Sequence, residues 1–206
     1  MTALILVDIQ NDFLPGGALA VPEGDQIVPV VNRLLPRFAV VVATQDWHPP
    51  DHGSFAANHP GRKPYEQADL DGLPQTLWPT HCVQYTGGAL LAPGLDTRHV
   101  TRVFPKGTNP RVDSYSGLFD NGHWQSTGLA EWLRERAVTE VSMAGLATDY
   151  CVKFTALDAR REGFQVNLIE DACRGVNLAP GDVARALDEM RQAGVRVIRS
   201  GDLALP

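Results

Sequence analysis

The sequence predicts an α/β fold in which helices cover both faces of a parallel sheet. Six short runs are nearly continuous in apolar, often β-branched residues, as expected for strands buried on both faces. They span residues 3–7, 38–44, 99–104, 140–146, 165–170 and 195–200. Helix-length amphipathic segments lie between most of them, at 25–36, 127–137, 150–162 and 180–193. Such alternation favours right-handed crossovers, which make the strands parallel.

Helix start and stop residues support these segments. Gly163 and Gly194 lie just past two of them, where a glycine commonly ends a helix. Thr127 and Pro180 stand where helices are expected to begin.

One long segment, residues 45–95, departs from the alternation. It is rich in Pro, Gly, His and Asp and has only a weak helical or strand pattern. An irregular segment of this length inside a domain seldom acts only as a linker. We therefore expect an ordered excursion that helps to form a site. The composition shows no break elsewhere, and we expect a single domain over residues 1–206.

Charge and cysteine content exclude several classes of function. The net charge is −6, and no concentrated basic face is evident, which argues against nucleic-acid or membrane-surface binding. Three cysteines, odd in number and widely spaced, predict free thiols in a reducing compartment. The apolar N-terminus lacks a basic flank and reaches an acidic residue at Asp8, so it is not expected to be a signal peptide. These observations favour a cytoplasmic protein.

Polar residues follow four of the predicted strands directly. Asp8 follows the first strand, Asp46 and His48 the second, Lys106 the third and Cys151 the fourth. Ligands of parallel α/β sheets bind at the carboxyl ends of the strands. The four placements therefore predict one shared site.

Taken alone, Cys151 could have either of two roles. A free cysteine is more often a small buried hydrophobe than a nucleophile. Here the thiol is expected in the first turn of a helix that opens near Asp149, where unpaired N–H groups and the helix dipole favour a thiolate. We expect Lys106 to lower the thiol pKa further and Asp8 to take and return the proton. Cys82 and Cys173 are expected to be structural.

A second group of residues is typical of a metal site. Asp46, His48 and His52 fall close together, and His81 follows later in the same excursion. Asp and His donors without a thiolate pair suit a divalent cation with open positions, Zn²⁺ first, with Fe²⁺ and Mn²⁺ as alternatives.

Five segments together resemble the nicotinamidases of the isochorismatase-like cysteine hydrolases. They are DIQNDF, TQDWHPPDHGSFA, WPTHCVQ, FPKGTNPRVDSYSGLFDN and GLATDYCVKFTALDA, in the family's order, and the similarity runs from about residue 2 to 199. The resemblance implies a three-layer doubly wound fold with a six-stranded parallel sheet. It implies the catalytic triad Asp8, Lys106 and Cys151.

The resemblance also assigns the remaining site residues. It implies one divalent metal ion held by Asp46, His48 and His81, with His52 carried over only as a candidate additional ligand because loop lengths differ. A cis peptide at Leu146–Ala147 is implied, with the N–H groups of Ala147 and Cys151 forming an oxyanion hole. The aromatic wall of the substrate site is implied to be Phe13, Trp78 and Tyr115.

The implied activity is hydrolysis of nicotinamide to nicotinate and ammonia through a cysteine thioester, a step of NAD salvage, with pyrazinamide as a further substrate. The expected partner is this small molecule, without nucleic acid or membrane, and a homo-oligomer is compatible with the sequence. Two alternatives stand beside it. One is another amidohydrolase of the superfamily that acts on a different small amide. The other is a catalytically silent protein that binds a small ligand or senses oxidation of Cys151.

Overall fold

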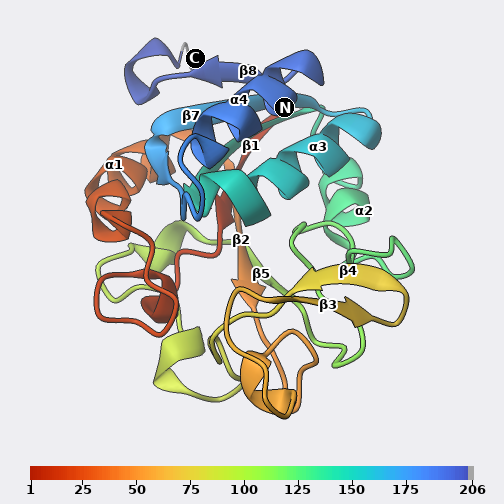
Figure 1. Ribbon diagram of the computed structural model, residues 1–206. Coiled ribbons are helices and arrows are strands. Elements are labelled where there is room, and N and C mark those ends of the chain that lie inside the picture. The colour runs from red at the N-terminus through yellow and green to blue at the C-terminus, as the bar shows by residue number, and fades with distance from the viewer. Residues whose placement is uncertain (204–206) are drawn as a thin grey trace.

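The six predicted strands form one parallel sheet in the computed structural model, which describes residues 1–203 (Figure 1). The sheet order is β5-β2-β1-β6-β7-β8. The chain first winds outward from β1 through β2 to β5, then returns to β6 and winds the other way. This doubly wound order places the topological switch between β1 and β6, the position where such sheets bind ligands. The strands are β1 (Thr2–Val7), β2 (Val40–Asp46), β5 (Arg102–Lys106), β6 (Glu140–Leu146), β7 (Gln165–Arg174) and β8 (Arg196–Ile198).

Helices cover both faces of the sheet, as predicted. Side chains of β1 alternate between the faces: Leu4 and Leu6 belong to the core under α1, and Ala3 and Ile5 to the core under the other three helices. Figure 1 shows α1 apart from α2, α3 and α4, which lie together. Their bounds are α1 (Ile27–Leu34), α2 (Leu129–Arg134), α3 (Lys153–Arg161) and α4 (Asp182–Gln192).

Several element boundaries differ from the predicted ones. The third strand was predicted from residue 99, but β5 begins at Arg102 because a 3-10 turn occupies Thr97–His99. The third helix was predicted from residue 150, but residues Thr148–Val152 form a π-helical turn, η7, before α3 begins. The other short helical turns are η1 (Asn11–Phe13), η2 (Gly24–Gln26), η3 (Leu35–Arg37), η4 (Ala56–Asn58), η5 (Gly87–Ala89), η6 (Thr97–His99) and η8 (Ser200–Asp202).

The excursion at residues 45–95 is ordered and contains a hairpin. Strands β3 (Gln67–Leu70) and β4 (Leu73–Thr76) pair antiparallel, with Leu70 opposite Leu73. The two residues between them, Asp71 and Gly72, both have positive φ, as a tight Asp-Gly hairpin turn requires. Beyond the hairpin, Gly53 and Trp78 join the excursion to the rest of the chain through backbone hydrogen bonds and core packing.

Among the helices that the structure describes, none is both long enough and apolar enough to span a bilayer.

Candidate active site

The strand ends bring the predicted triad together. Asp8 follows β1, Lys106 ends β5 beside Asp46 of β2, and Cys151 lies in the turn after β6. The Lys106 ammonium is the centre of the group. Its Nζ lies 3.0 Å from Asp8 Oδ2 and 3.4 Å from Cys151 Sγ, and it also forms an ion pair with Asp46 Oδ1. A hydrogen bond of 2.8 Å to the Ser114 carbonyl completes its contacts.

Burial and mutual charge set the protonation of Lys106 and Asp8. Burial pushes the pKa of Lys106 down, but Asp46 and Asp8 outweigh it and hold that pKa well above its ordinary value. The lysine therefore stays a cation. Burial raises the pKa of Asp8, and although Lys106 opposes this, the net shift is upward. A carboxylate with a raised pKa is a better proton acceptor, as a general base needs to be.

The thiol of Cys151 differs from the prediction. Burial raises its pKa well above the ordinary value; Lys106 lowers it, but the nearby carboxylates of Asp8 and Asp46 raise it. The expected contribution of Lys106 is thus present, but the net shift of the Cys151 pKa is upward, opposite to the lowering expected from the sequence. One carboxylate oxygen of Asp8, one of Asp46 and the sulfur lie within 4.8 Å of one another, so Asp8 is placed to take the proton.

The turn that carries Cys151 has an unusual backbone. The peptide between Leu146 and Ala147 is cis, as the family resemblance implied. The N–H of Val152 reaches back five residues to the Ala147 carbonyl at 3.1 Å, which gives the turn its π-helical form. Single π turns occur often at functional sites. Within the described residues, the backbone N–H of Ala147 donates no hydrogen bond, and Ala147 lines the same pocket as Cys151.

The predicted metal ligands also lie close together. Nε2 of His48 lies 3.5 Å from Asp46 Oδ2, and Nε2 of His81 lies 3.7 Å from the same oxygen. In each ring Nδ1 faces a backbone carbonyl, that of Gly107 at 2.9 Å and that of Pro79 at 2.7 Å. A carbonyl only accepts, so Nδ1 carries the hydrogen in the neutral rings, and both Nε2 lone pairs are free. Two imidazoles and one carboxylate with fixed tautomers fit a divalent cation.

His52 lies beside this group but outside it. Its ring centroid is 4.3 Å from that of His48, and its donor atom forms a separate close group with those of His48 and Asp113. Burial lowers the pKa of His52 to about 4, with His48 as the second cause. The ring is therefore neutral at physiological pH.

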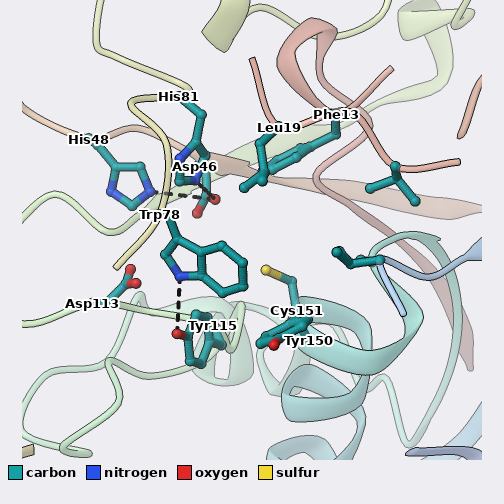
Figure 2. A pocket seen from close by; sticks show the side chains of 13 residues that line it. Phe13, Leu19, Asp46, His48, Trp78, His81, Asp113, Tyr115, Tyr150 and Cys151 are labelled. Atoms are coloured by element: carbon teal, nitrogen blue, oxygen red, sulfur yellow. Dashed lines mark hydrogen bonds and ion pairs between the residues drawn. The ribbon is translucent and has the colours of Figure 1, made fainter. Parts of the chain in front are cut away.

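A pocket opens between the two groups (Figure 2). It encloses about 410 Å³ including its open mouth, which is within the range of small-molecule sites. Figure 2 shows His48 and His81 on one side of the pocket and Cys151 on the other, while a carboxylate oxygen of Asp46 lies within 4.8 Å of the Cys151 sulfur. The three aromatic residues predicted to form its wall all line it: Phe13, Trp78 and Tyr115.

Several residues of the site were not predicted. Thr44 donates to Asp8 Oδ1 at 2.6 Å and accepts from the Asp8 backbone N–H at 3.2 Å. Gln10 holds the end of β2, because its amide bonds both the N–H and the carbonyl of Asp46 at 2.8 Å. Both lie beside predicted residues in the chain, and a polar residue at the end of an apolar strand is a signal that would have found Thr44. The unpredicted pocket-lining residues are Leu19, Val21, Asp113, Tyr150 and Val176.

Known proteins are similar to this chain over nearly its whole length. The family model described as the Isochorismatase domain matches residues 2–202. The chain is 56% identical over 204 residues to the nicotinamidase of Escherichia coli strain K12, a match that covers 97% of this chain and 95% of that protein.

Solved structures give the same result. A nicotinamidase/pyrazinamidase of Acinetobacter baumanii superposes with a TM-score of 0.95 at 47% identity, covering 98% of this chain and 97% of that one. A pyrazinamidase of Pyrococcus horikoshii, solved in complex with zinc, has a TM-score of 0.78 at 42% identity and covers 96% of this chain and 98% of the other.

Proposed function

The chain belongs to the isochorismatase family, and on that premise we propose that it is a nicotinamidase, which hydrolyses nicotinamide to nicotinate and ammonia. The observation that carries the proposal is the buried contact of Lys106 with both Asp8 and Cys151 at the inner end of a pocket sized for a small ring. The similar proteins named as nicotinamidases support the choice of substrate.

Binding comes first. The flat pyridine ring enters between Phe13, Trp78 and Tyr115, and the carboxamide points toward Cys151. Trp78 and Tyr115 are fixed to each other, since the indole Nε1 donates to the Tyr115 hydroxyl at 3.2 Å. Because the wall is held in place before the substrate arrives, little ordering is needed on binding. Because the small rigid amide is already oriented when it is bound, much of the entropy cost of the attack is met during binding.

Acylation follows. Asp8 accepts the thiol proton as the sulfur of Cys151 attacks the amide carbon, and the Lys106 ammonium stabilises the negative charge on sulfur. The backbone N–H groups of Ala147 and Cys151 hold the oxyanion of the tetrahedral intermediate. Asp8 then gives its proton to the departing nitrogen, which leaves as ammonia.

Deacylation uses the same groups. Water attacks the nicotinoyl thioester while Asp8 takes a proton from it, and the oxyanion is held as before. Collapse of the intermediate breaks the C–S bond, the proton on Asp8 returns to the sulfur, and the product leaves as nicotinic acid, which ionises to nicotinate in solution. The cycle consumes one water and leaves Asp8, Lys106 and Cys151 in their starting states.

A divalent cation at Asp46, His48 and His81 completes the site. When bound, it supplies an anchor for the ring nitrogen of the substrate. We propose Zn²⁺, because the similar pyrazinamidase was solved with zinc and the donor set suits that ion. Elemental analysis of the purified protein distinguishes zinc from iron and manganese.

Pyrazinamide is a second substrate on this proposal. It has the same ring shape and carboxamide, with a further nitrogen in the ring, and a similar protein is named for both activities.

The test is release of ammonia and nicotinate from nicotinamide by the wild type and by Cys151→Ala. We expect turnover by the wild type and background release by the variant. Equal, background-level rates in both proteins, with metal present and the fold intact, would overturn the proposal.

A further inference from the structure

Asp149 lies in the turn η7, two residues before Cys151, and the proposed reaction does not use its carboxylate. The residue is buried, with 5% of its surface exposed. Its two oxygens accept from two consecutive backbone N–H groups, Oδ1 from Val176 at 2.9 Å and Oδ2 from Asn177 at 2.7 Å. Hydrogen bonds to an ionised carboxylate are about twice as strong as bonds between neutral groups. Asp149 therefore joins the turn that carries the nucleophile to a second segment of the chain.

The second segment is the loop after β7, residues 175–181. It leaves the sheet at the same edge as η7, because β6 and β7 are parallel neighbours. A Cβ at Gly175 would lie 3.0 Å from Asp149 Oδ1 and 2.2 Å from Val183 Cγ2, so the loop comes this close only because a glycine stands there. Asn177 has φ 56°, a left-handed backbone that asparagine adopts more readily than most residues. The backbone of this loop is thus shaped to reach the carboxylate.

Val176 is the residue of this loop that lines the pocket. It is half-buried and packs against the core that contains Phe13 and Ala147. Ala147 and Cys151 line the same pocket, so the space between the nucleophile and this part of the wall depends on how η7 and the loop are joined. The pocket, at about 410 Å³ with its mouth, is near the lower end for small-molecule sites. A small shift of one wall therefore changes which rings fit.

We propose that Asp149 is a positioning residue: it ties the Cys151 turn to the loop after β7 and so holds Val176 as the wall that excludes amides with substituted rings. The inference deepens the proposed function and rests on it for the substrate. A wall that is removed or displaced admits an additional methyl group, and one carbon in an apolar pocket changes discrimination by about 10- to 200-fold. The two hydrogen bonds to Asp149 are independent of any activity.

A comparison of amides with different rings tests the proposal. The value of kcat/KM is measured for nicotinamide and for nicotinamides that carry a methyl group at each free ring carbon in turn. The ratio of the methylated to the parent amide is then compared among variants. The fraction of folded enzyme and the reactivity of the thiol affect both amides alike and cancel from this ratio. A role of Asp149 in stability alone would therefore leave the ratio unchanged.

Val176→Ala is expected to raise the ratio about tenfold or more for at least one methyl isomer. Asp149→Asn sets an NH₂ group against one of the two N–H groups and keeps one acceptor. It is expected to raise the ratio for the same isomer roughly threefold to tenfold. The double variant should have the ratio of Val176→Ala alone, because the wall that Asp149 positions is gone. An unchanged ratio in either single variant, or additive effects in the double variant, overturns the proposal.

The matched control is Asp182→Asn. Asp182 accepts from the Ala179 N–H at 2.7 Å in the same loop, but it does not line the pocket. Its replacement should keep the wild-type ratio. A rise as large as that of Asp149→Asn would overturn the proposal, because any disturbance of the loop would then have the same effect.

Amide hydrogen exchange gives a readout that needs no turnover. The N–H groups of Val176 and Asn177 should be protected in the wild type and exchange faster in Asp149→Asn, while the amides of β1 stay protected in both. Fast exchange of the two groups in the wild type overturns the proposal. If Asp149→Asn does not fold, this exchange and the Val176→Ala ratio decide. A wild type that hydrolyses none of the amides but protects both groups would refute the nicotinamidase proposal while supporting the contact proposed here.

Discussion

At the scale of single residues, the charges around Lys106 explain the direction of the Cys151 pKa shift. Before a cation binds at Asp46, the buried site holds one ammonium and two carboxylates, a net charge of −1 before the thiol ionises. A thiolate would add a second negative charge to a buried group, which burial disfavours. Transfer of the proton from Cys151 to Asp8 leaves the total charge unchanged. The site is therefore suited to a transfer of the proton to Asp8 that accompanies the attack.

The hydrogen bond from Thr44 to Asp8 allows the role of Asp8 as the base to be tested. Its hydroxyl donates to Asp8 and lowers the pKa of Asp8, whose net shift is nevertheless upward. Asp8 works as a base only when ionised, so activity rises as the pH rises through its pKa. Thr44→Val removes the donor, raises that pKa, and is expected to move the acid limb of the kcat/KM profile to higher pH. Loss of one bond to a charged group also predicts a fall of roughly ten- to a hundredfold at low pH.

The matched control is Thr44→Ser, which keeps the hydroxyl and should keep the wild-type acid limb. If Thr44→Val left the limb in place, Asp8 would not be the titrating base.

Residue-level chemistry was predictable where it depended on chain position. Asp8, Lys106 and Cys151 each follow a strand, and the parallel sheet brings strand ends together whatever their distance in the chain. The upward shift of the Cys151 pKa was not predictable, because it depends on complete burial beside two carboxylates, and burial is a property of the packed molecule.

At the scale of elements, the close packing of β6 against β1 places the Cys151 turn. Gly145 of β6 has φ +140°, and a Cβ built on it would lie 2.0 Å from the Val7 carbonyl oxygen. No side chain fits there without moving one of the two strands. The glycine thus allows β6 to approach β1 just before the chain turns into η7.

Gly145→Ala is accordingly expected to destabilise the protein by about 3 kcal/mol or more, from overpacking and from the left-handed backbone. Urea unfolding followed by circular dichroism measures this. Gly201→Ala is the control, because a Cβ there meets no atom within 4 Å, and it should be nearly neutral. Equal unfolding midpoints for both variants would show that the close approach is not required.

Strands and helices were predictable from period and composition, since both faces of the sheet are buried. The ends of the helices and the structure of residues 45–95 were less predictable. The π-helical turn replaces the first turn of the expected third helix, because the chain must leave β6 and present Cys151 to the pocket. The hairpin of β3 and β4 was missed although Asp71–Gly72 is a strong local turn signal, because its flanking runs lack clean alternation.

At the scale of the whole molecule, the site joins parts that are far apart in the chain. Asp46 ends β2 and His48 follows it by two residues, while His81 belongs to the later part of the excursion. A cation held by all three ties the excursion to the sheet in the folded state only. Ligands that bind only the folded state stabilise it by mass action.

Removal of the metal should therefore lower the melting temperature of the whole domain. For an ion present at 100 to 1,000 times its Kd, the expected loss is about 5–15 °C in a protein of this size. Differential scanning calorimetry with and without a chelator measures it. His81→Ala should abolish the chelator effect, whereas His99→Ala, at an exposed position in η6, should keep it. A chelator effect of the same size in His81→Ala would contradict the ligand set.

The central claim is that a thioester forms on Cys151, and rapid-quench mass spectrometry during a single turnover of nicotinamide tests it most directly. We predict a nicotinoyl adduct that appears and decays as nicotinate forms, located on the peptide that contains Cys151 and absent from Cys151→Ala. Nicotinate produced at the wild-type rate by Cys151→Ala, or by a wild type whose adduct is found on another residue, would contradict the account.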